Sequence, residues 1–324
     1  MSGSPTAPEQ GTEHPAERPA TADWAQRPER SNMAMLRLMA WLSLHLGRPT
    51  GRVLLHLIAA YFVAFAPAAR RASRDYLGRA LGRRARLTDG YRHVFSFAAT
   101  IHDRLYLLKD RFELFDIRIE GAELIHDQTA RGRGALLFGA HFGSFEVIRA
   151  VGRNQPGLQI ALAMYEDNAR KINTLLSAIN PAARPEVIGL GRLDAMLRIR
   201  QRLADGALVG VLADRSLDDD ARVHLPLLGS PAPLPLGPFR MAAMLRARVI
   251  FMAGLYHGGN RYTVRFLPIA DFAGLGEPGA PTRDEAIHAA MQAYAAALET
   301  CCREAPSNWF NFFPFWGDAP QAPQ

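Results

Sequence analysis

A histidine and a glutamate five positions apart are the residues of this chain whose types and spacing best suit acid–base chemistry. His141 follows the apolar run ALLFGA (residues 135–140), and Glu146 closes the segment HFGSFE. In one continuous helix the two side chains would point about 500° apart, so they can meet only if His141 lies in the turn before a helix and Glu146 in its first turns. Gly143 gives such a turn a permissive backbone, and Ser144 is a suitable N-cap.

A carboxylate beside an imidazole is the usual arrangement of a general base. Hydrogen-bonded to one ring nitrogen, Glu146 would fix the tautomer of His141 and leave the other nitrogen to take a proton from a hydroxyl. The chain contains no Gly-x-Ser-x-Gly elbow for a serine nucleophile. Direct attack by an acceptor hydroxyl is therefore expected rather than an acyl-enzyme. Geometry alone leaves open that the two residues are an accidental pair.

The elements that must position this turn alternate between strand and helix. Short apolar runs indicate strands, and apolar residues three or four positions apart indicate helices. The alternation predicts a mixed α/β fold with a largely parallel sheet flanked by helices, and reactive side chains where strands end. The expected strands are residues 135–140, 158–165, 187–190 and 207–214, and the expected helices are residues 146–152, 168–180 and 192–204.

The chain before the α/β region is expected to be helical and partly apolar. Residues 33–47 and 53–69 read as apolar helices of about 15 and 17 residues, whereas a bilayer span needs about 20. A single span and an interfacial hairpin would both leave the rest of the chain in the cytoplasm, and a helical pair buried in the core is the alternative. Membrane attachment is favoured because arginines that could meet anionic head groups follow the second helix: Arg70, Arg71, Arg74, Arg79, Arg83, Arg84 and Arg86.

Residues 1–32 are rich in proline and lack an apolar run, which predicts disorder, and they lack the features of a signal peptide. We therefore expect four parts. They are a disordered segment (1–32), a helical membrane-associating region (33–110), an α/β domain (111–316) and a disordered tail (317–324).

Composition excludes several other classes of protein. The net charge is +7, but of the 38 basic residues only Lys109 and Lys171 are lysines, so a compositional bias explains the charge better than nucleic-acid binding. The two cysteines, Cys301 and Cys302, are neighbours without zinc-ligand spacing, which indicates inert thiols. No metal, cofactor or nucleic-acid partner is expected.

The segment GALLFGAHFGSFEVIRAVG (134–152) resembles the His-x4-Asp/Glu motif of the lysophospholipid acyltransferase superfamily, in the branch of the lipid A biosynthesis late acyltransferases. Further segments resemble this branch in the same order along the chain. The last of them is similar to family members found with aryl polyene and related pigment pathways. These segments are residues 23–32, 97–108, 210–217, 226–242, 247–268 and 306–316.

The resemblance implies transfer of an acyl group from an acyl carrier protein or coenzyme A thioester to a hydroxyl of a lipid or glycolipid, at the cytoplasmic face of a bacterial inner membrane. It makes His141 the general base and Glu146 its orienting carboxylate. The oxyanion would need backbone N–H groups of the turn or Arg215. The expected substrate-binding residues are Asp214, Arg215, Arg240, Gly143 and Ser144.

One departure from the superfamily concerns the acceptor. Glycerophosphate acyltransferases carry a Phe-Pro-Glu-Gly-Thr-type block that binds phosphate, and the corresponding residues 233–240 read PLPLGPFR, without the Glu or Thr. Glycerol 3-phosphate is therefore the less expected acceptor.

Several alternatives stay open. Arg215 could instead pair with Asp214 or with the acidic run at 218–220, and Arg240 could be solvated surface. The aromatic segment 309–316 could pack into the core, line an acyl groove or sit at the bilayer interface. For the whole protein the alternatives are a thioesterase or esterase, in which water replaces the alcohol, and a non-catalytic lipid-binding subunit of a synthase complex. His102-Asp103 and His126-Asp127 are expected to be structural pairs.

Overall fold

The computed structural model describes residues 33–148, 152, 157–165, 186–191, 194–215 and 221–317. The side chains of residues 33–46, 129 and 165 are outside this description. The segment expected to be disordered (1–32) and the helix expected at 168–180 also lie outside the described residues.

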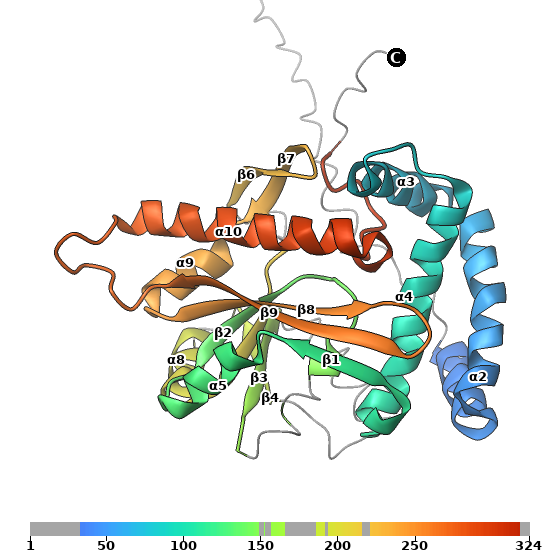
Figure 1. Cartoon of the computed structure of the whole chain (residues 1–324), viewed down its shortest axis with the longest axis horizontal. Helices are drawn as coiled ribbons and strands as arrows, with labels where there is room; N and C mark the ends of the chain where they lie inside the picture. Colours follow the sequence, from blue (N-terminus) through green and yellow to red (C-terminus); the bar gives the residue numbers. More distant parts are fainter. Residues whose placement is uncertain are drawn as a thin grey trace, which may run out of the picture.

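A seven-stranded sheet in the order β1-β9-β8-β2-β5-β3-β4 forms the centre of the fold (Figure 1). The β8–β9 pair is antiparallel, and every other pair of neighbours is parallel. The expected mixed, largely parallel α/β fold is therefore confirmed. The strands are β1 (Asp116–Glu120), β2 (Ala135–Gly139), β3 (Ile160–Tyr165), β4 (Glu186–Leu190), β5 (Leu208–Leu212), β8 (Arg248–Tyr256) and β9 (Arg261–Asp271).

Strand β2 shows why these residues form a central strand. Every one of its residues is buried, since the strand has neighbours on both edges and helices on both faces. Its side chains alternate: Leu136 and Phe138 belong to the core on one face, and Ala135 and Leu137 to the core on the other. A continuous apolar run is therefore what the position requires.

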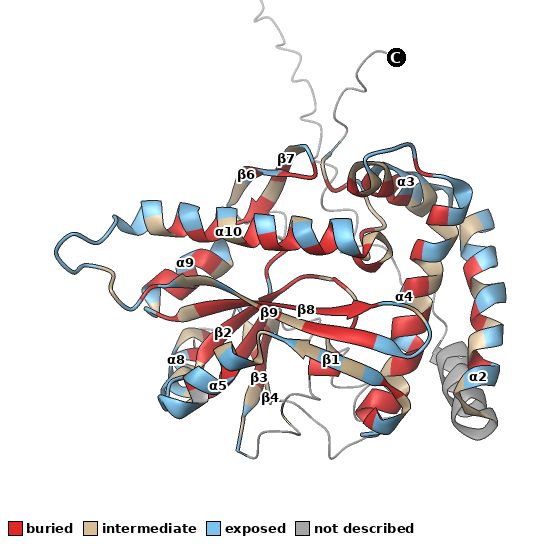
Figure 2. Cartoon of the chain, in the orientation of Figure 1, coloured by how far each residue is buried: buried red, intermediate tan, exposed pale blue. Residues whose placement is uncertain are grey.

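Helices cover both faces of the sheet, and the buried residues concentrate between the layers (Figure 2). One core includes residues of α3, α8, α9 and α10, and the other includes residues of α2, α4 and α5. Figure 1 shows α2, α3 and α4 gathered at one end of the sheet. The helices are α2 (Met33–Phe65), α3 (Pro67–Leu81), α4 (Leu87–Leu108), α5 (Ala122–Ala130), α8 (Ala195–Ala204), α9 (Gly237–Met244) and α10 (Arg283–Glu304).

The two expected apolar helices form one long element that is interrupted at Gly47, where the backbone adopts a positive φ of 81°. The second part ends at Phe65, and Pro67 begins α3, as a proline in the first turn allows. Within the described residues no single helix is long and apolar enough to cross a membrane. The pair Gly47–Phe65 and Pro67–Leu81, bent by 97°, reaches that length and composition only together.

An ion cluster attaches α2 to the rest of the fold. Asp103 of α4 is fully buried and forms an ion pair with Arg48 of α2, in which Arg48 Nε lies 2.8 Å from Asp103 Oδ1. The hydroxyl of Tyr262 in β9 donates to the same carboxylate at 2.8 Å. Asp103, which we expected in a structural pair with His102, thus joins three elements of the fold.

Two further segments differ from the sequence-based expectation. Of the helix expected at 146–152, the structure describes a 3-10 turn at Glu146–Ile148 and a helical Gly152, and residues 149–151 lie outside the description. The family-like segment 226–242 falls on a hairpin of β6 (Arg222–Leu227) and β7 (Ser230–Pro235) that leads into α9. Local apolar spacing did not reveal that Leu225, Leu227 and Leu234 pack into the core from this hairpin.

Candidate active site

Two adjacent parallel strands bring His141 and Asp214 together. Strands β2 and β5 are neighbours, and Gly139 pairs with Leu212 at their carboxyl ends. His141 and Asp214 each follow two residues beyond this pair, so both leave the same edge of the sheet. Ligands of open α/β folds bind at this edge.

The Asp214 carboxylate makes three hydrogen bonds, two of them with His141. Its Oδ1 lies 2.9 Å from His141 Nδ1, and its Oδ2 accepts from the His141 backbone N–H at 3.0 Å and from the indole N–H of Trp309 at 2.9 Å. Burial by itself raises the pKa of Asp214, but His141, Arg215 and the Trp309 N–H hold this pKa well below its usual range. The ionised carboxylate only accepts hydrogen bonds, so Nδ1 carries the proton and Nε2 keeps its lone pair.

The His141 ring is accessible on one side, since 35% of the side chain is exposed. Burial of the rest lowers the pKa of His141, and the charge of Arg215 lowers it further, while Asp214 opposes both. The imidazole is therefore neutral near pH 7 and can take a proton at Nε2.

Glu146 lies against α4 rather than at the His141 ring. Its Oε1 is 2.5 Å from Nε of Arg104, and its Oε2 accepts from the Ser144 hydroxyl at 3.4 Å. The structure thus pairs His141 with Asp214, which we had expected among the substrate-binding residues, and pairs Glu146 with Arg104. Glu146 lies in the short 3-10 turn Glu146–Ile148, and this turn packs against α4, the helix that carries Arg104. The position of the turn therefore places the Glu146 carboxylate beside Arg104. The ion pair ties the turn to α4.

Gly143 and Ser144 shape the turn through close backbone contacts. Gly143 has a φ of +60°, and a Cβ there would lie 1.9 Å from the carbonyl oxygen of Gly254. Only glycine fits this position. The N–H groups of Gly143 and Ser144 donate to the carbonyls of Asn308 and Gly254, each at 2.8 Å. These two N–H groups of the turn are therefore already bonded within the protein, whereas backbone N–H groups of the turn were candidate donors to the oxyanion.

The two candidate arginines lie in different surroundings. Arg215 is half-buried beside His141 and Asp214, where its Nη2 donates to the Phe310 carbonyl at 2.8 Å and its guanidinium lies 4.9 Å from the centre of the Phe313 ring. Its Nε is 3.9 Å from Asp214, so the ion pair that we considered as the alternative role of Arg215 also exists. Arg240 is exposed on α9. The structure brings Arg215 to the site and places Arg240 on the surface.

The C-terminal segment contributes site residues that sequence reasoning did not assign. The N–H of Phe310 donates to the carbonyl of His141 at 2.9 Å, and Trp309 forms an antiparallel bridge with Phe142. Trp309 is fully buried, which agrees with the core-packing alternative, whereas Phe310 is half-buried. The density of aromatic residues at 309–316 was the available signal, but it carried no information about which residue faces Asp214.

We compared the chain with curated proteins and with models of protein families. No curated protein matches the chain. The family described as bacterial lipid A biosynthesis acyltransferase matches residues 93–317, which contain His141, Asp214 and the C-terminal segment. This range is more than half of the 324 residues. The chain therefore belongs to the bacterial lipid A biosynthesis acyltransferase family.

Proposed function

We propose that this acyltransferase is an O-acyltransferase that moves an acyl group from an acyl carrier protein or coenzyme A thioester to a hydroxyl of a lipid or glycolipid. The observation that supports it best is the neutral, partly exposed His141, whose Nδ1 is held by an ionised carboxylate and whose Nε2 is available as a base. Residues 233–240 lack the Glu and Thr of the phosphate-binding block of glycerophosphate acyltransferases, which argues against glycerol 3-phosphate as the acceptor.

The proposed reaction is direct transfer. Nε2 of His141 takes the proton of the acceptor hydroxyl while its oxygen attacks the thioester carbonyl carbon. The tetrahedral oxyanion collapses, the carbon–sulfur bond breaks, and the leaving sulfur takes the proton from the imidazolium. The products are an ester and a free thiol. Asp214 stays ionised throughout and stabilises the imidazolium by its charge.

Arg215 is the group that we propose to stabilise the oxyanion. Its charge lies close enough to lower the pKa of His141. A fixed positive charge beside a developing oxyanion stabilises the transition state more than the ground state. Arg240 is exposed on α9, and its proposed role is to contact a negatively charged part of a substrate.

A labelled acyl-thioester assay separates the candidate activities. The purified full-length protein is incubated with acyl carrier protein or coenzyme A donors, with and without total membrane lipid. An acyltransferase transfers the label to lipid and releases thiol only when lipid is present. Lipid-independent release of free fatty acid would identify a thioesterase, and absence of both products would identify the non-catalytic lipid-binding alternative.

The pH dependence of kcat/KM follows from the lowered pKa of His141. The base works only as neutral imidazole, so activity falls as the pH drops through this pKa. We expect the acidic limb below about pH 6.5, the ordinary histidine value, with activity retained into mildly acidic solution. Measurement of kcat/KM from about pH 5 to pH 8 tests this. An acidic limb above the ordinary value would contradict the assigned surroundings of His141.

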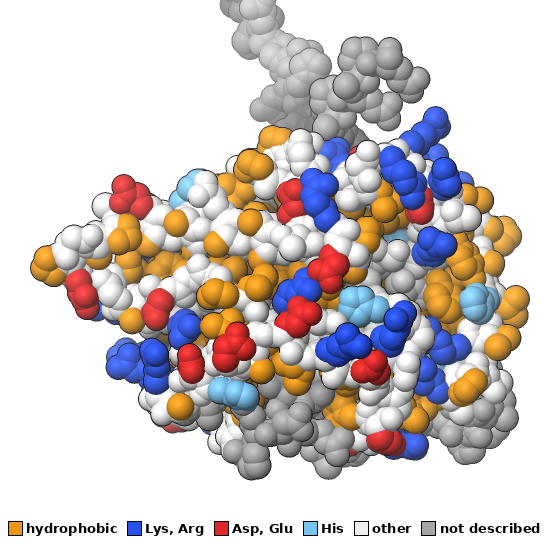
Figure 3. Space-filling model, viewed as in Figure 1, with side chains coloured by type: hydrophobic (Ala, Val, Ile, Leu, Met, Phe, Trp, Pro, Cys, Tyr) orange, Lys and Arg blue, Asp and Glu red, His pale blue; other side chains and the backbone are white. Residues whose placement is uncertain are grey.

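We propose that α2 attaches the protein to a membrane surface. Val53, Leu57, Tyr61 and Phe65 follow one another at four-residue intervals on α2, and each is more than half exposed. Figure 3 shows hydrophobic side chains along the edge of the molecule where α2 lies. Leu55 and Ala59, on the opposite side of the helix, are buried. The buried side of α2 packs on the fold, and its exposed apolar side is free to insert into the interface of a membrane.

Five of the seven arginines that follow α2 fall into two groups. Arg79 bonds the Ser230 hydroxyl and lies 4.5 Å over the Trp316 ring, and Arg83 pairs with Asp89 at 2.8 Å. Arg71, Arg74 and Arg84 are exposed. Two negative partners fit this second group, an anionic lipid surface and an acidic carrier protein, and one experiment distinguishes them.

The test variant is Arg71→Glu/Arg74→Glu/Arg84→Glu. At about 1 kcal/mol per arginine near an anionic surface, a lipid role predicts about 100-fold or more weaker binding to vesicles of phosphatidylcholine and phosphatidylglycerol. A docking role predicts a raised KM for the carrier-protein donor, with vesicle binding intact.

The matched control makes the same change of charge at exposed arginines elsewhere, Arg118→Glu/Arg131→Glu/Arg133→Glu. If vesicle binding and the KM for the carrier-protein donor are the same in the test variant, the control and wild type, Arg71, Arg74 and Arg84 are solvated surface residues without a role in either interaction.

A further inference from the structure

A buried chain of hydrogen bonds connects the helical region to the catalytic pair. The proposed function assigns His141 as base and Asp214 as its partner, and the inference that follows rests on that assignment. Asp214 is held on its other oxygen by Trp309, whose indole N–H donates to Oδ2 at 2.9 Å. Trp309 is itself fully buried.

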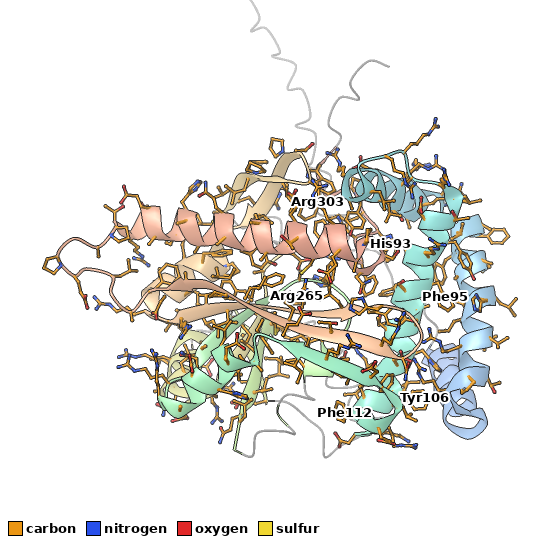
Figure 4. All side chains as sticks on the ribbon, in the orientation of Figure 1. His93, Phe95, Tyr106, Phe112, Arg265 and Arg303 are labelled. Carbon is orange, nitrogen blue, oxygen red and sulfur yellow. The ribbon has the colours of Figure 1, made fainter. Side chains whose placement is uncertain are left out.

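The carbonyl of Trp309 is held in turn by His93 of α4. Nε2 of His93 lies 2.8 Å from this carbonyl oxygen, and Nδ1 lies 2.7 Å from the Ser73 hydroxyl in α3. A carbonyl only accepts, so Nε2 carries the proton and Nδ1 accepts from Ser73. Burial lowers the pKa of His93 to about 4, which keeps this tautomer neutral throughout the working pH range. Figure 4 shows His93 on α4 beside the C-terminal end of α10.

The same segment also fixes the backbone of the catalytic turn. Asn308 accepts from the Gly143 N–H, and the Phe310 N–H donates to the His141 carbonyl. The Asn308 side chain is anchored to both backbone groups of Tyr256, at 2.7 and 3.0 Å. Displacement of Trp309 would therefore move the ring of His141 and the carboxylate of Asp214 together.

We infer that Trp309 and His93 are positioning residues of the acyl transfer, which hold the Asp214 carboxylate in line with His141 and transmit the packing of α3 and α4 to the base. Neither side chain takes part in proton transfer. A fully satisfied buried network specifies one geometry, and a carboxylate displaced by a fraction of an ångström no longer orients the ring.

Trp309→Phe tests the inference because it removes the N–H donor and keeps an aromatic ring. We expect kcat to fall roughly tenfold to a hundredfold, as for loss of a hydrogen bond to a charged group, while KM for the donor stays unchanged. The acidic limb of the pH profile should move to higher pH, because a carboxylate that lacks this donor attracts the imidazolium more strongly. Loss of packing alone would lower stability without moving the limb.

Trp316→Phe is the matched control. The Trp316 indole N–H is buried and has no hydrogen-bond partner among the described residues, so the same substitution there should preserve kcat and the pH profile. Wild-type kcat and pH profile in folded Trp309→Phe protein would overturn the inference, and so would an equal loss in Trp316→Phe.

Two substitutions of His93 test the positioning role even if Trp309→Phe does not fold. His93→Gln keeps an N–H donor near the Trp309 carbonyl, whereas His93→Leu does not. We expect His93→Leu to lower kcat severalfold and His93→Gln to retain most of it. Equal kcat values for the two would overturn the inference. Failure of the proposed function is a different result, in which His141→Ala keeps wild-type turnover.

Discussion

His141→Ala protein is expected to lose nearly all acyl transfer, with kcat lower by about 10²–10⁴-fold, the usual contribution of a general base. The loss should appear in kcat more than in KM for the thioester, because the proton is taken only as the acceptor hydroxyl attacks. The labelled-thioester assay with membrane lipid measures both quantities. His141 is partly exposed, so the substitution should leave the fold intact.

The matched control is substitution of a histidine remote from the pair. His126 is exposed on α5, and His126→Ala should have wild-type turnover. Near-normal turnover in folded His141→Ala protein would rule out the proposed mechanism and direct attention to another base.

Asp214→Asn is expected to cost about as much, about 10²–10⁴-fold in kcat, through the wrong histidine tautomer. Oδ2 receives two donors, the His141 backbone N–H and the Trp309 indole N–H. The amide oxygen of the substituted side chain would therefore take the Oδ2 position, and its NH₂ group would face Nδ1 of His141. Nδ1 then has to accept, so the proton moves to Nε2, which can no longer act as a base. Steady-state kinetics together with thermal unfolding separates this effect from loss of the fold.

The comparison variant is Glu146→Gln, which removes the charge that pairs with Arg104. It should lower kcat less than Asp214→Asn, because Glu146 supports the turn and does not contact the ring. A larger loss in Glu146→Gln than in Asp214→Asn would mean that the carboxylate at the fifth position orients the base during catalysis, as the sequence motif had indicated.

Much of the fold was predictable because its signals are local. Each central strand is buried on both faces, so it has to be a short continuous apolar run, and residues 135–140 and 207–214 show this without any knowledge of their neighbours. The alternation with helices then predicts a parallel sheet and a site at its carboxyl edge. His141 was located in this way.

The predictions that failed or stayed incomplete depend on contacts between distant segments. The 3-10 turn at Glu146 and the hairpin at 222–235 are stabilised by packing against α4 and α10, and periodicity does not report such packing. The domain boundaries and the location at an inner membrane stay predictions.

The sequence by itself determined the fold class, the family and the identity of the proposed base, since these depend on residue order within short segments. The tertiary structure alone decided which carboxylate reaches that base. Asp214 lies 73 positions from His141, and the two meet only because β5 inserts between β2 and β3 with Leu212 in register with Gly139. Trp309 and His93 join them across still longer separations, through packing of α4 and the C-terminal segment. Strand order and helix docking result from the summed burial of many side chains, so no single motif encodes them.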